Sequence, residues 1–363
     1  MQKRKSKLNV ENLETRQMMA GDVAAYVSGG NLYINEAAGQ VGQDNGVFIS
    51  QLANGKIRVS GDFTPEAGGV SKVNGMASQE FTVTGDLVVK LGAGNDGVSF
   101  DDASSPTFNN VSIDVSAPMP VVAKSTSMAK STSMTMAKGF TGGTIFNQPD
   151  NDDVYIGSAR TRGSFSINTG PGSDQVFMSK FGIGSAPNGH NGDLNINTGA
   201  GADNVFLQTS SGQTISNVFG KVNIQTYSSL NETDQDEVFI ETMLALDDVL
   251  VRTGGGSDNV HMNRVTSAGK LDLNTGTGDD TATLLRTHTV DGLFARMGEG
   301  ADALHVDTVL GNATLMGEGG SDSLTHMNLR GSNNSLTGWE RINGRLNFDI
   351  YQVSQPQVAT RSF

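Results

Sequence analysis

Apolar and polar residues alternate along most of the chain in short runs, and a glycine-containing corner separates each run from the next. The stretch 194–207, LNINTGAGADNVFL, is typical: Leu194 and Ile196 alternate with polar residues, a Thr-Gly-x-Gly corner follows, and the alternation resumes after Asp203. A period of two residues predicts a β-strand with one buried face. Glycine in the corner admits backbone angles that a Cβ atom would forbid. Each unit is therefore predicted to be a strand, a tight corner and a second strand.

This unit recurs at a nearly constant step. Clear copies occupy 88–100, 165–178, 194–207, 249–262, 271–284, 293–306 and 313–326, and two degenerate copies end at Ile156 and Ile240. A step of about 22 residues between corner aspartates, with two longer steps, predicts a repeat architecture with loops inserted in two units. We take the corner aspartates to be Asp153, Asp174, Asp203, Asp236, Asp258, Asp280, Asp302 and Asp322.

The pattern predicts an all-β fold, a right-handed parallel β-helix (solenoid) with coils of about 22 residues. Parallel strands about 4.8 Å apart would stack equivalent positions into columns. One inward column would contain Ile167, Ile196, Ile224, Val251, Leu273, Ala295 and Leu315, and a second Val176, Val205, Val238, Val260, Ala282, Leu304 and Leu324. An antiparallel sandwich is the alternative, but its hairpins would not repeat one corner motif at a fixed step.

Composition shifts suggest how the chain is organised. The expected parts are a basic leader at 1–22, a cap and first coils at 23–116, an inserted loop at 117–149, regular coils at 150–326 and a C-terminal cap at 327–363. The inserted loop repeats AKSTSM and lacks a strand pattern, which is typical of a flexible linker. Trp339 and the last strand would shield the open end of the solenoid.

Charge and cysteine content restrict the partners. The 363 residues carry a formal net charge of −13 and no cysteine, so disulfides and thiolate metal sites are excluded. An acidic body repels nucleic acid and anionic lipid, and it suits divalent cations or basic partners. No apolar run approaches the ~20 residues of a membrane helix, so we expect no transmembrane segment.

The N-terminus has a basic run followed by VENLETRQMMAGD at 10–22. It lacks the apolar core of ~7–15 residues that a secretory signal needs. It resembles the LEPR-type segment of secreted and surface proteins of planctomycete bacteria. Leu13, Glu14 and Arg16 keep the core of that motif, Thr15 replaces its usual Pro or Asp, and a Met pair replaces its Leu pair. The resemblance implies export to the cell surface or the extracellular space.

The corner aspartates admit two interpretations. Aspartate caps backbone N–H groups in turns, which explains one per corner. Stacked carboxylates would repel one another, however, and a cation between coils would relieve that repulsion; Ca²⁺ suits flexible carboxylate ligands best. The units also resemble the GGxGxD repeats of hemolysin-type (RTX) proteins, as in GGGSD at 254–258. That resemblance implies Ca²⁺ on the eight aspartates, but those repeats are consecutive nonapeptides, so half of each paired site is missing here.

Phe177, Phe206 and Phe239 share one repeat position between two inward residues, so we expect them to point outward. They would form either a ladder covered by a loop or a strip that binds a partner. A surface or matrix glycan or protein is the expected partner. The sequence leaves the oligomeric state open.

The function that follows is a structural or adhesive role outside the cell, stiffened by Ca²⁺ if the aspartates bind it. The alternative is a carbohydrate-active β-helix enzyme, a lyase or hydrolase acting on an acidic glycan, since Arg252 and Arg296 share a column. No G-x-S-x-G, Walker-type loop or H-E-x-x-H pattern is found, and fold analogy alone does not make an enzyme. We therefore favour the structural role and expect no catalytic residue.

Overall fold

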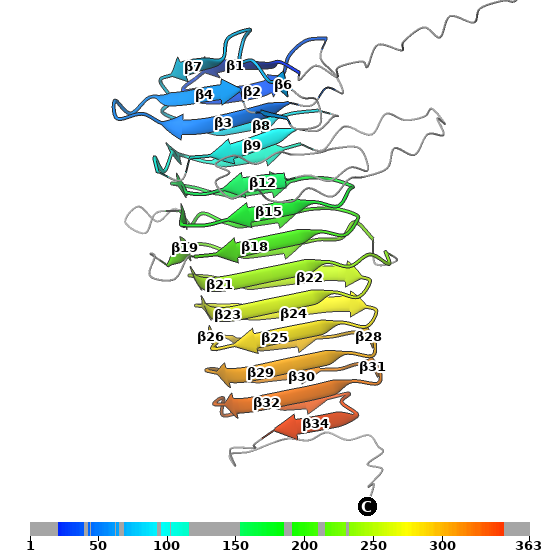
Figure 1. Ribbon diagram of the computed structural model, residues 1–363. Coiled ribbons are helices and arrows are strands. Elements are labelled where there is room, and N and C mark those ends of the chain that lie inside the picture. The colour runs from blue at the N-terminus through cyan, green and yellow to red at the C-terminus, as the bar shows by residue number, and fades with distance from the viewer. Residues whose placement is uncertain are drawn as a thin grey trace, which may run out of the picture.

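The chain builds an all-β structure, and the described residues contain no helix (Figure 1). The computed structural model describes residues 21–39, 43, 45–61, 63–64, 69–92, 96–101, 103–115, 153–184, 191–209, 215–229 and 232–344. The predicted leader and inserted loop lie outside these residues, apart from the last residues of the leader.

The first sheet is parallel except at its N-terminal edge, where β1 runs antiparallel to β2. Two short strands, β28 (Glu299–Gly300) and β31 (Gly319–Gly320), extend it around the corner. In spatial order its main strands are β1 (Val23–Ser28), β2 (Asn31–Glu36), β8 (Leu87–Lys90), β11 (Val111–Asp114), β14 (Phe165–Asn168), β17 (Leu194–Asn197), β20 (Val222–Gln225), β22 (Val249–Gly255), β24 (Lys270–Thr277), β27 (Gly292–Arg296), β30 (Ala313–Met316) and β33 (Ser335–Thr337).

The second sheet is also mostly parallel, and it bends so that two strands of one repeat unit can belong to it. Its central strands are β9 (Gly97–Phe100), β12 (Asp153–Ile156), β15 (Gln175–Met178), β18 (Asn204–Gln208), β21 (Glu237–Ala245), β23 (Asn259–Ser267), β25 (Thr281–Leu285), β29 (Ala303–Val309), β32 (Ser323–Leu329) and β34 (Arg341–Gly344). After the bend lie β10 (Thr107–Phe108), β13 (Ala159–Thr161), β16 (Phe181–Ile183), β19 (Ser216–Val218) and β26 (His288–Thr289).

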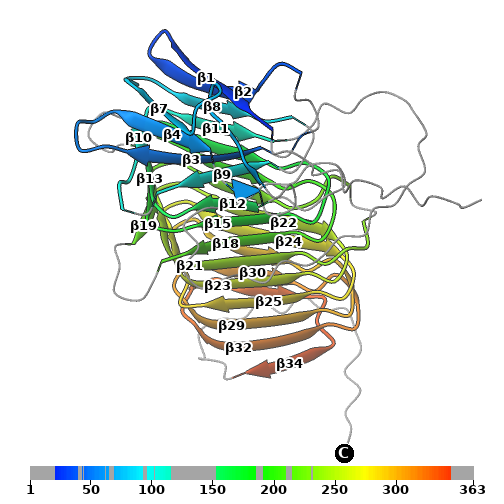
Figure 2. The ribbon, with the colours of Figure 1, turned by 45° about the horizontal axis from the view of Figure 1, so that its top comes forward.

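The N-terminal end differs from the rest because it contains hairpins. Strand β3 (Gly46–Gln51) is parallel to β9 but antiparallel to β4 (Ile57–Gly61), and β7 (Ser78–Phe81) continues the antiparallel part. Strands β5 (Phe63–Thr64) and β6 (Gly69–Val70) form a separate antiparallel pair. Figure 2 shows these strands projecting from the stack of parallel units.

The register stacks equivalent residues of successive units, as the alternation predicted. Ile167 pairs with Ile196, Ile196 with Ile224, and Ile224 with Val251. On the other sheet Val176 pairs with Val205 and Val205 with Val238. Both predicted inward columns are confirmed, because all their members are buried.

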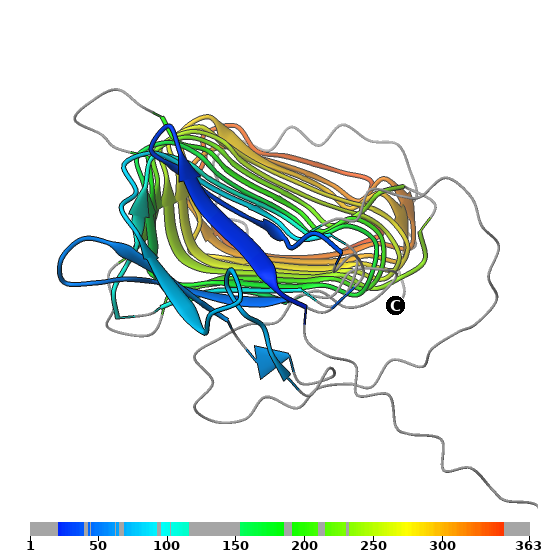
Figure 3. The same cartoon turned by 90° about the horizontal axis from the view of Figure 1, so that it is seen from above.

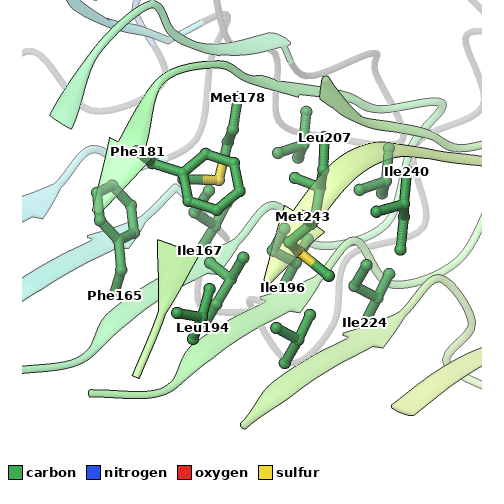
Figure 4. Packing of buried hydrophobic residues seen from close by; sticks show 14 of the residues in the cluster. Phe165, Ile167, Met178, Phe181, Leu194, Ile196, Leu207, Ile224, Ile240 and Met243 are labelled. Atoms are coloured by element: carbon green, nitrogen blue, oxygen red, sulfur yellow. The ribbon is translucent and has the colours of Figure 1, made fainter. Parts of the chain in front are cut away.

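The core between the sheets is one continuous apolar cluster. Phe165, Ile167, Leu194 and Ile196 of the first sheet point at residues of the second, such as Met178 and Leu207 (Figure 4). Figure 3 shows successive units lying over one another around a single outline. The all-β, mostly parallel arrangement is compatible with a solenoid.

The C-terminal end of the core is partly exposed. Ile342 belongs to the inward column that includes Leu324, yet its side chain is 49% exposed. Trp339 packs against the core and donates its indole N–H to the Leu315 carbonyl (3.0 Å). The last described rung is therefore only partly covered by described residues, and the predicted cap at 327–363 stays a prediction.

One column of non-glycine residues has left-handed backbone angles at the bend of the second sheet. The φ angles there are 59° at Thr242, 56° at Arg264, 51° at Arg286, 57° at Thr308 and 56° at Asn328. A left-handed conformation costs an L-residue about 1–2 kcal/mol, least for Asn and Gly. The column therefore contains strain that only Asn328 avoids.

We expect Thr242→Asn to raise the free energy of unfolding by about 0.5–1 kcal/mol, because Asn tolerates the left-handed angles better than a β-branched residue. Denaturant unfolding followed by circular dichroism measures the change. The control is Thr266→Asn, an outward strand position, where loss of β propensity should leave stability equal or lower. A loss of stability in T242N would contradict the strain argument.

Candidate functional site

A column of buried aspartates runs along the corner that precedes the second sheet. We call it the aspartate column. Each member is at most 2% exposed, although an ionisable residue is rarely buried without a partner. Its described members are Asp96, Asp174, Asp203, Asp236, Asp258, Asp280, Asp302 and Asp322.

From Asp203 to Asp322, each aspartate accepts the backbone N–H of its neighbour in the preceding unit. The Asp174 N–H donates to Asp203 Oδ1 (2.8 Å), and the Asp203 N–H donates to Asp236 Oδ1 (2.9 Å). The same bond recurs at Asp236, Asp258, Asp280 and Asp302, each donating to the next aspartate at 2.9–3.0 Å. The carboxyls thus cap corner N–H groups that the sheets leave unpaired, which is the turn-cap function predicted from the sequence.

The two ends of the ladder use other residues. Asn45 begins it by donating its backbone N–H to Asp96 Oδ1 (2.9 Å). The Asp322 N–H ends it at Glu340 Oε2 (2.6 Å). A glutamate oxygen accepts this bond at the C-terminal end, so capping alone does not require aspartate inside the column.

Asp153, which the sequence placed among the corner aspartates, does not belong to the column. The register pairs Asp153 with Gln175 and Val154 with Val176. The position opposite Asp174 is therefore residue 152, which lies outside the described residues. A one-residue slip moves a side chain to the other face of a strand, so the column assignment of Asp153 was wrong. Burial nevertheless raises the pKa of Asp153 to about 7.

A second buried column, of threonines, lies beside the carboxyls. Thr169 Oγ1 is 2.5 Å from Asp174 Oδ2, and Thr226 Oγ1 is 2.5 Å from Asp236 Oδ2. The Thr253 hydroxyl donates to the Thr275 carbonyl of the next unit (3.1 Å). Sequence reasoning missed this column, although the Thr of the Thr-Gly-x-Gly corner recurs at Thr169, Thr198, Thr253 and Thr275.

Burial shifts the acidity of the column. Desolvation raises the pKa of Asp203 and of Asp236 to about 8, and Asp174 beside Asp203 adds to the rise. Desolvation also raises the pKa of Asp280 to about 7 and of Asp302 to about 6. It raises the pKa of Asp258 and Asp322 as well. These shifts exceed the lowering by the backbone N–H bonds.

The column does not fit the oxygen cage that Ca²⁺ requires. Along the ladder from Asp203 to Asp322, each Oδ1 already accepts a backbone N–H, whereas Ca²⁺ takes six to eight oxygen ligands. In the described part of the chain, no group of three or more His, Asp or Glu side chains could hold a metal ion. Calcium binding stays a prediction of the resemblance, and these contacts do not support it.

Two glycine positions keep the corners tight. Gly276 has φ 104° and Gly278 has φ 122°, angles that favour glycine. A Cβ on Gly276 would overlap the Gly254 carbonyl oxygen, and one on Gly278 would overlap the Gly256 carbonyl oxygen. Close stacking of the corners brings each aspartate within hydrogen-bonding distance of the next.

Aromatic side chains form a second column on the outer face of the second sheet. The register pairs Tyr155, Phe177, Phe206, Phe239 and His261 in succession, and we call this row the aromatic strip. Tyr155 stacks on Phe177 (ring centroids 4.9 Å, planes 3° apart), and Phe239 stacks on His261 (4.8 Å, 10°). All five side chains are half-buried.

The strip extends the three phenylalanines predicted from the sequence at both ends. Tyr155 was missed because its unit was the degenerate one. His261 follows Phe239 in the register and stacks on its ring. Stacked rings turn their faces to each other, so mainly ring edges are left for a partner.

The features expected of a glycan-cleaving site are sparse in the described residues. Arg252 and Arg296 share a column through Asn274, as predicted, but Arg296 is ion-paired with Asp272 (2.5 Å), which also binds Lys270 (3.0 Å). One hollow of about 290 Å³ contains a single basic residue and no carboxyl; it is lined by Gln51, Val83, Thr84, Gly85, Thr107 and Arg162.

Comparison with known proteins identifies the N-terminal segment. Residues 4–23 match a family described as Planctomycete extracellular. The match contains Leu13, Glu14 and Arg16, on which the LEPR-type resemblance rests, and residues 4–20 of it lie outside the described residues. No curated protein and no solved structure matches the chain. In the described part of the chain, no helix has the length and apolarity needed to cross a membrane.

We expect Gly276→Ala to lower the free energy of unfolding by more than about 3 kcal/mol, because the new Cβ meets the backbone of the neighbouring unit. Chemical denaturation measures the loss. Gly319→Ala is the matched control at the same corner, since a Cβ there lies 3.7 Å from the Glu299 side chain; we expect a change within about 0.5 kcal/mol. Equal effects of the two substitutions would contradict the close packing of the corners.

Calcium binding can be tested directly by thermal melting of the full chain in chelator, in millimolar Ca²⁺ and in millimolar Mg²⁺. A ligand at 100 times its Kd adds about 2.7 kcal/mol, which would raise Tm by several degrees. The contacts described above lead us to expect the same Tm in all three solutions. A rise specific to Ca²⁺ would support the resemblance instead.

Proposed function

We propose that this exported, extracellular protein is a right-handed parallel β-helix with a structural role, a rigid spacer that also contacts its surroundings. Right-handed crossovers are strongly preferred between parallel strands, which favours this hand. A match to the extracellular family supports the location, and the parallel register supports the coil. The proposal assigns no catalytic step to the chain.

The observation that carries the proposal is the continuity of the corner ladder. From Asp174 to Glu340 each unit is tied to the next by a corner hydrogen bond in addition to the sheet bonds, and Asn45 and Asp96 form the same bond nearer the N-terminus. Each such bond adds about 0.5–1.5 kcal/mol and fixes the register of neighbouring units. A rod held in this way along its length suits a spacer better than a domain that must open and close.

The aromatic strip is the surface that we assign to adhesion. Phe206 and Phe239 are half-buried, and their rings are tilted by 44° at a centroid distance of 6.4 Å. Polar side chains flank them, among them Asn204 and Glu237 on one side and Glu241 on the other. Apolar edges between hydrogen-bonding groups suit a surface or matrix glycan or protein.

The enzyme alternative has less support in the described residues. An acid–base pair of carboxyls on one face would be expected for a hydrolase. Arg252 is half-buried, and Arg296 in the same column is ion-paired with Asp272. We therefore do not assign a glycan-cleaving activity.

We expect Phe206→Ser combined with Phe239→Ser to reduce binding of the full chain to insoluble planctomycete cell-envelope material at least about tenfold. A sedimentation assay measures the bound fraction, and protease treatment of the envelope separates glycan from protein partners. The control is Phe294→Ser, an outward, half-buried phenylalanine of the first sheet, which should bind as the wild type does. Undiminished binding by the double variant, with circular dichroism unchanged, would contradict the assignment.

A further inference from the structure

Two threonine hydroxyls beside the aspartate column each have more acceptors within reach than they have hydrogens to donate. Thr169 Oγ1 lies 2.5 Å from Asp174 Oδ2 and 3.1 Å from the Thr198 carbonyl oxygen. A threonine hydroxyl has one hydrogen, so it cannot donate to both acceptors. If the carboxyl itself carries a proton, Oδ2–H donates to the threonine and the threonine donates to the carbonyl. The same geometry occurs at Thr226, between Asp236 Oδ2 and the Thr253 carbonyl.

Farther along the column, the threonine hydroxyls are directed to carbonyls. Thr253 donates to the Thr275 carbonyl, and Thr275 donates to the Met297 carbonyl (2.6 Å). In the column from Asp203 onward, five carboxyls have an Oδ2 atom with no hydrogen-bond partner among the described residues: Asp203, Asp258, Asp280, Asp302 and Asp322. Each of these carboxyls has a donor at Oδ1 but none at Oδ2, and an ionised carboxylate buried in this way is more costly than a buried neutral carboxyl.

Among the described residues, the charged groups that act on the column from Asp203 to Asp322 are all acidic. The ionisable groups that act on it are other carboxyls: Glu232 and Asp234 on Asp258, Asp279 on Asp302, and Glu340 on Asp322. Asp234 also acts on Asp203, and the column members act on one another. A fully ionised column would therefore place a row of like charges in the protein interior.

We infer that carboxyls of the aspartate column hold protons in the folded protein at neutral pH, above all at Asp174 and Asp236, whose Oδ2 atoms face threonine hydroxyls, so that the corner is a row of proton-binding sites. Protons thus occupy the place that Ca²⁺ occupies in the GGxGxD repeats that these units resemble. The inference does not depend on the proposed structural role. It also explains why Asp rather than Asn recurs at these corners. The side-chain NH₂ of Asn would bring two hydrogen-bond donors, and the facing threonine oxygen would supply an acceptor for only one of them.

The raised pKa values of the column agree in direction with this inference. The pKa values of about 8 at Asp203 and Asp236 and about 7 at Asp280 lie far above the ordinary value of 3.8, chiefly because of burial. A folded pKa above the unfolded value gives stability that is full below the unfolded pKa and is lost as pH rises through the folded pKa. Stability should therefore decline from about pH 4 to about pH 8, and protons should be released on unfolding.

At a second, more exposed corner, an aspartate has a pKa shift of the opposite direction. There Asp248 Oδ1 accepts the Lys270 backbone N–H (3.0 Å), and Asp248 Oδ2 binds the Lys221 ammonium (3.0 Å). Partial burial raises the pKa of Asp248, but these two partners bring it below its ordinary value. Its stabilisation is therefore present above the unfolded pKa and is lost on acidification, which is the opposite sign.

The experiment compares thermal melts of the full chain between pH 5 and pH 8, in chelator, for the wild type and for Asp258→Asn with Asp280→Asn. We expect the wild-type Tm to fall by on the order of 10 °C over this range. The Tm of the double variant should be no higher than that of the wild type at pH 5 and higher than that of the wild type at pH 8. Its Tm should therefore fall less steeply with pH. The control, Asp248→Asn, should lose stability at pH 8 and keep the wild-type slope.

Two further measurements keep the inference testable if the double variant folds poorly. The infrared band of protonated carboxylic acids should be present in the wild type at pH 7. Unfolding in weakly buffered solution at pH 7 should release protons, and burial of neutral His326, whose pKa is lowered, contributes little there. A wild-type Tm that is flat or rises from pH 5 to pH 8, absence of the band, or a Ca²⁺-specific rise in Tm would each overturn the inference.

Discussion

The structure depends on the hydrogen bond from the backbone N–H of one corner aspartate to the Oδ1 atom of the aspartate one unit later. Parallel sheets pair the strands of successive units, but the corners between the sheets would leave N–H groups without partners. The bond from Asp203 to Asp236, repeated along the stack, fills this gap at the most tightly packed point of each unit. It also fixes register, because a slip of one residue would separate every carboxyl from its N–H.

Much of the fold could be predicted because its signals are local. The alternation at Leu194 and Ile196 and the glycine corner before Asp203 lie within one unit, and the repeat places each unit on the next. The assignment of Asp153 failed because its unit is degenerate and offers several acidic residues in a row. Only pairing with Gln175 reveals the register there.

The parts that could not be predicted depend on contacts between units. The threonine at Thr169 looked like a turn residue, and its contact with Asp174 Oδ2 follows from how the corner closes. The left-handed angle at Thr242 is imposed by the bend of the second sheet, against the residue's own preference. The antiparallel strands β4 and β7 do not follow the repeat at all.

An acidic protein outside the cell can hold a row of carboxyls in its interior only if something neutralises them. Hydrogen-exchange mass spectrometry or NMR of the corner amides tests most directly whether the ladder holds the structure together. The account predicts that the N–H groups of Asp203, Asp236 and Asp258 exchange as slowly as those of the central strands, since each is buried and bound to a carboxyl. Exchange as fast as that of exposed loops, with the strands still protected, would contradict it.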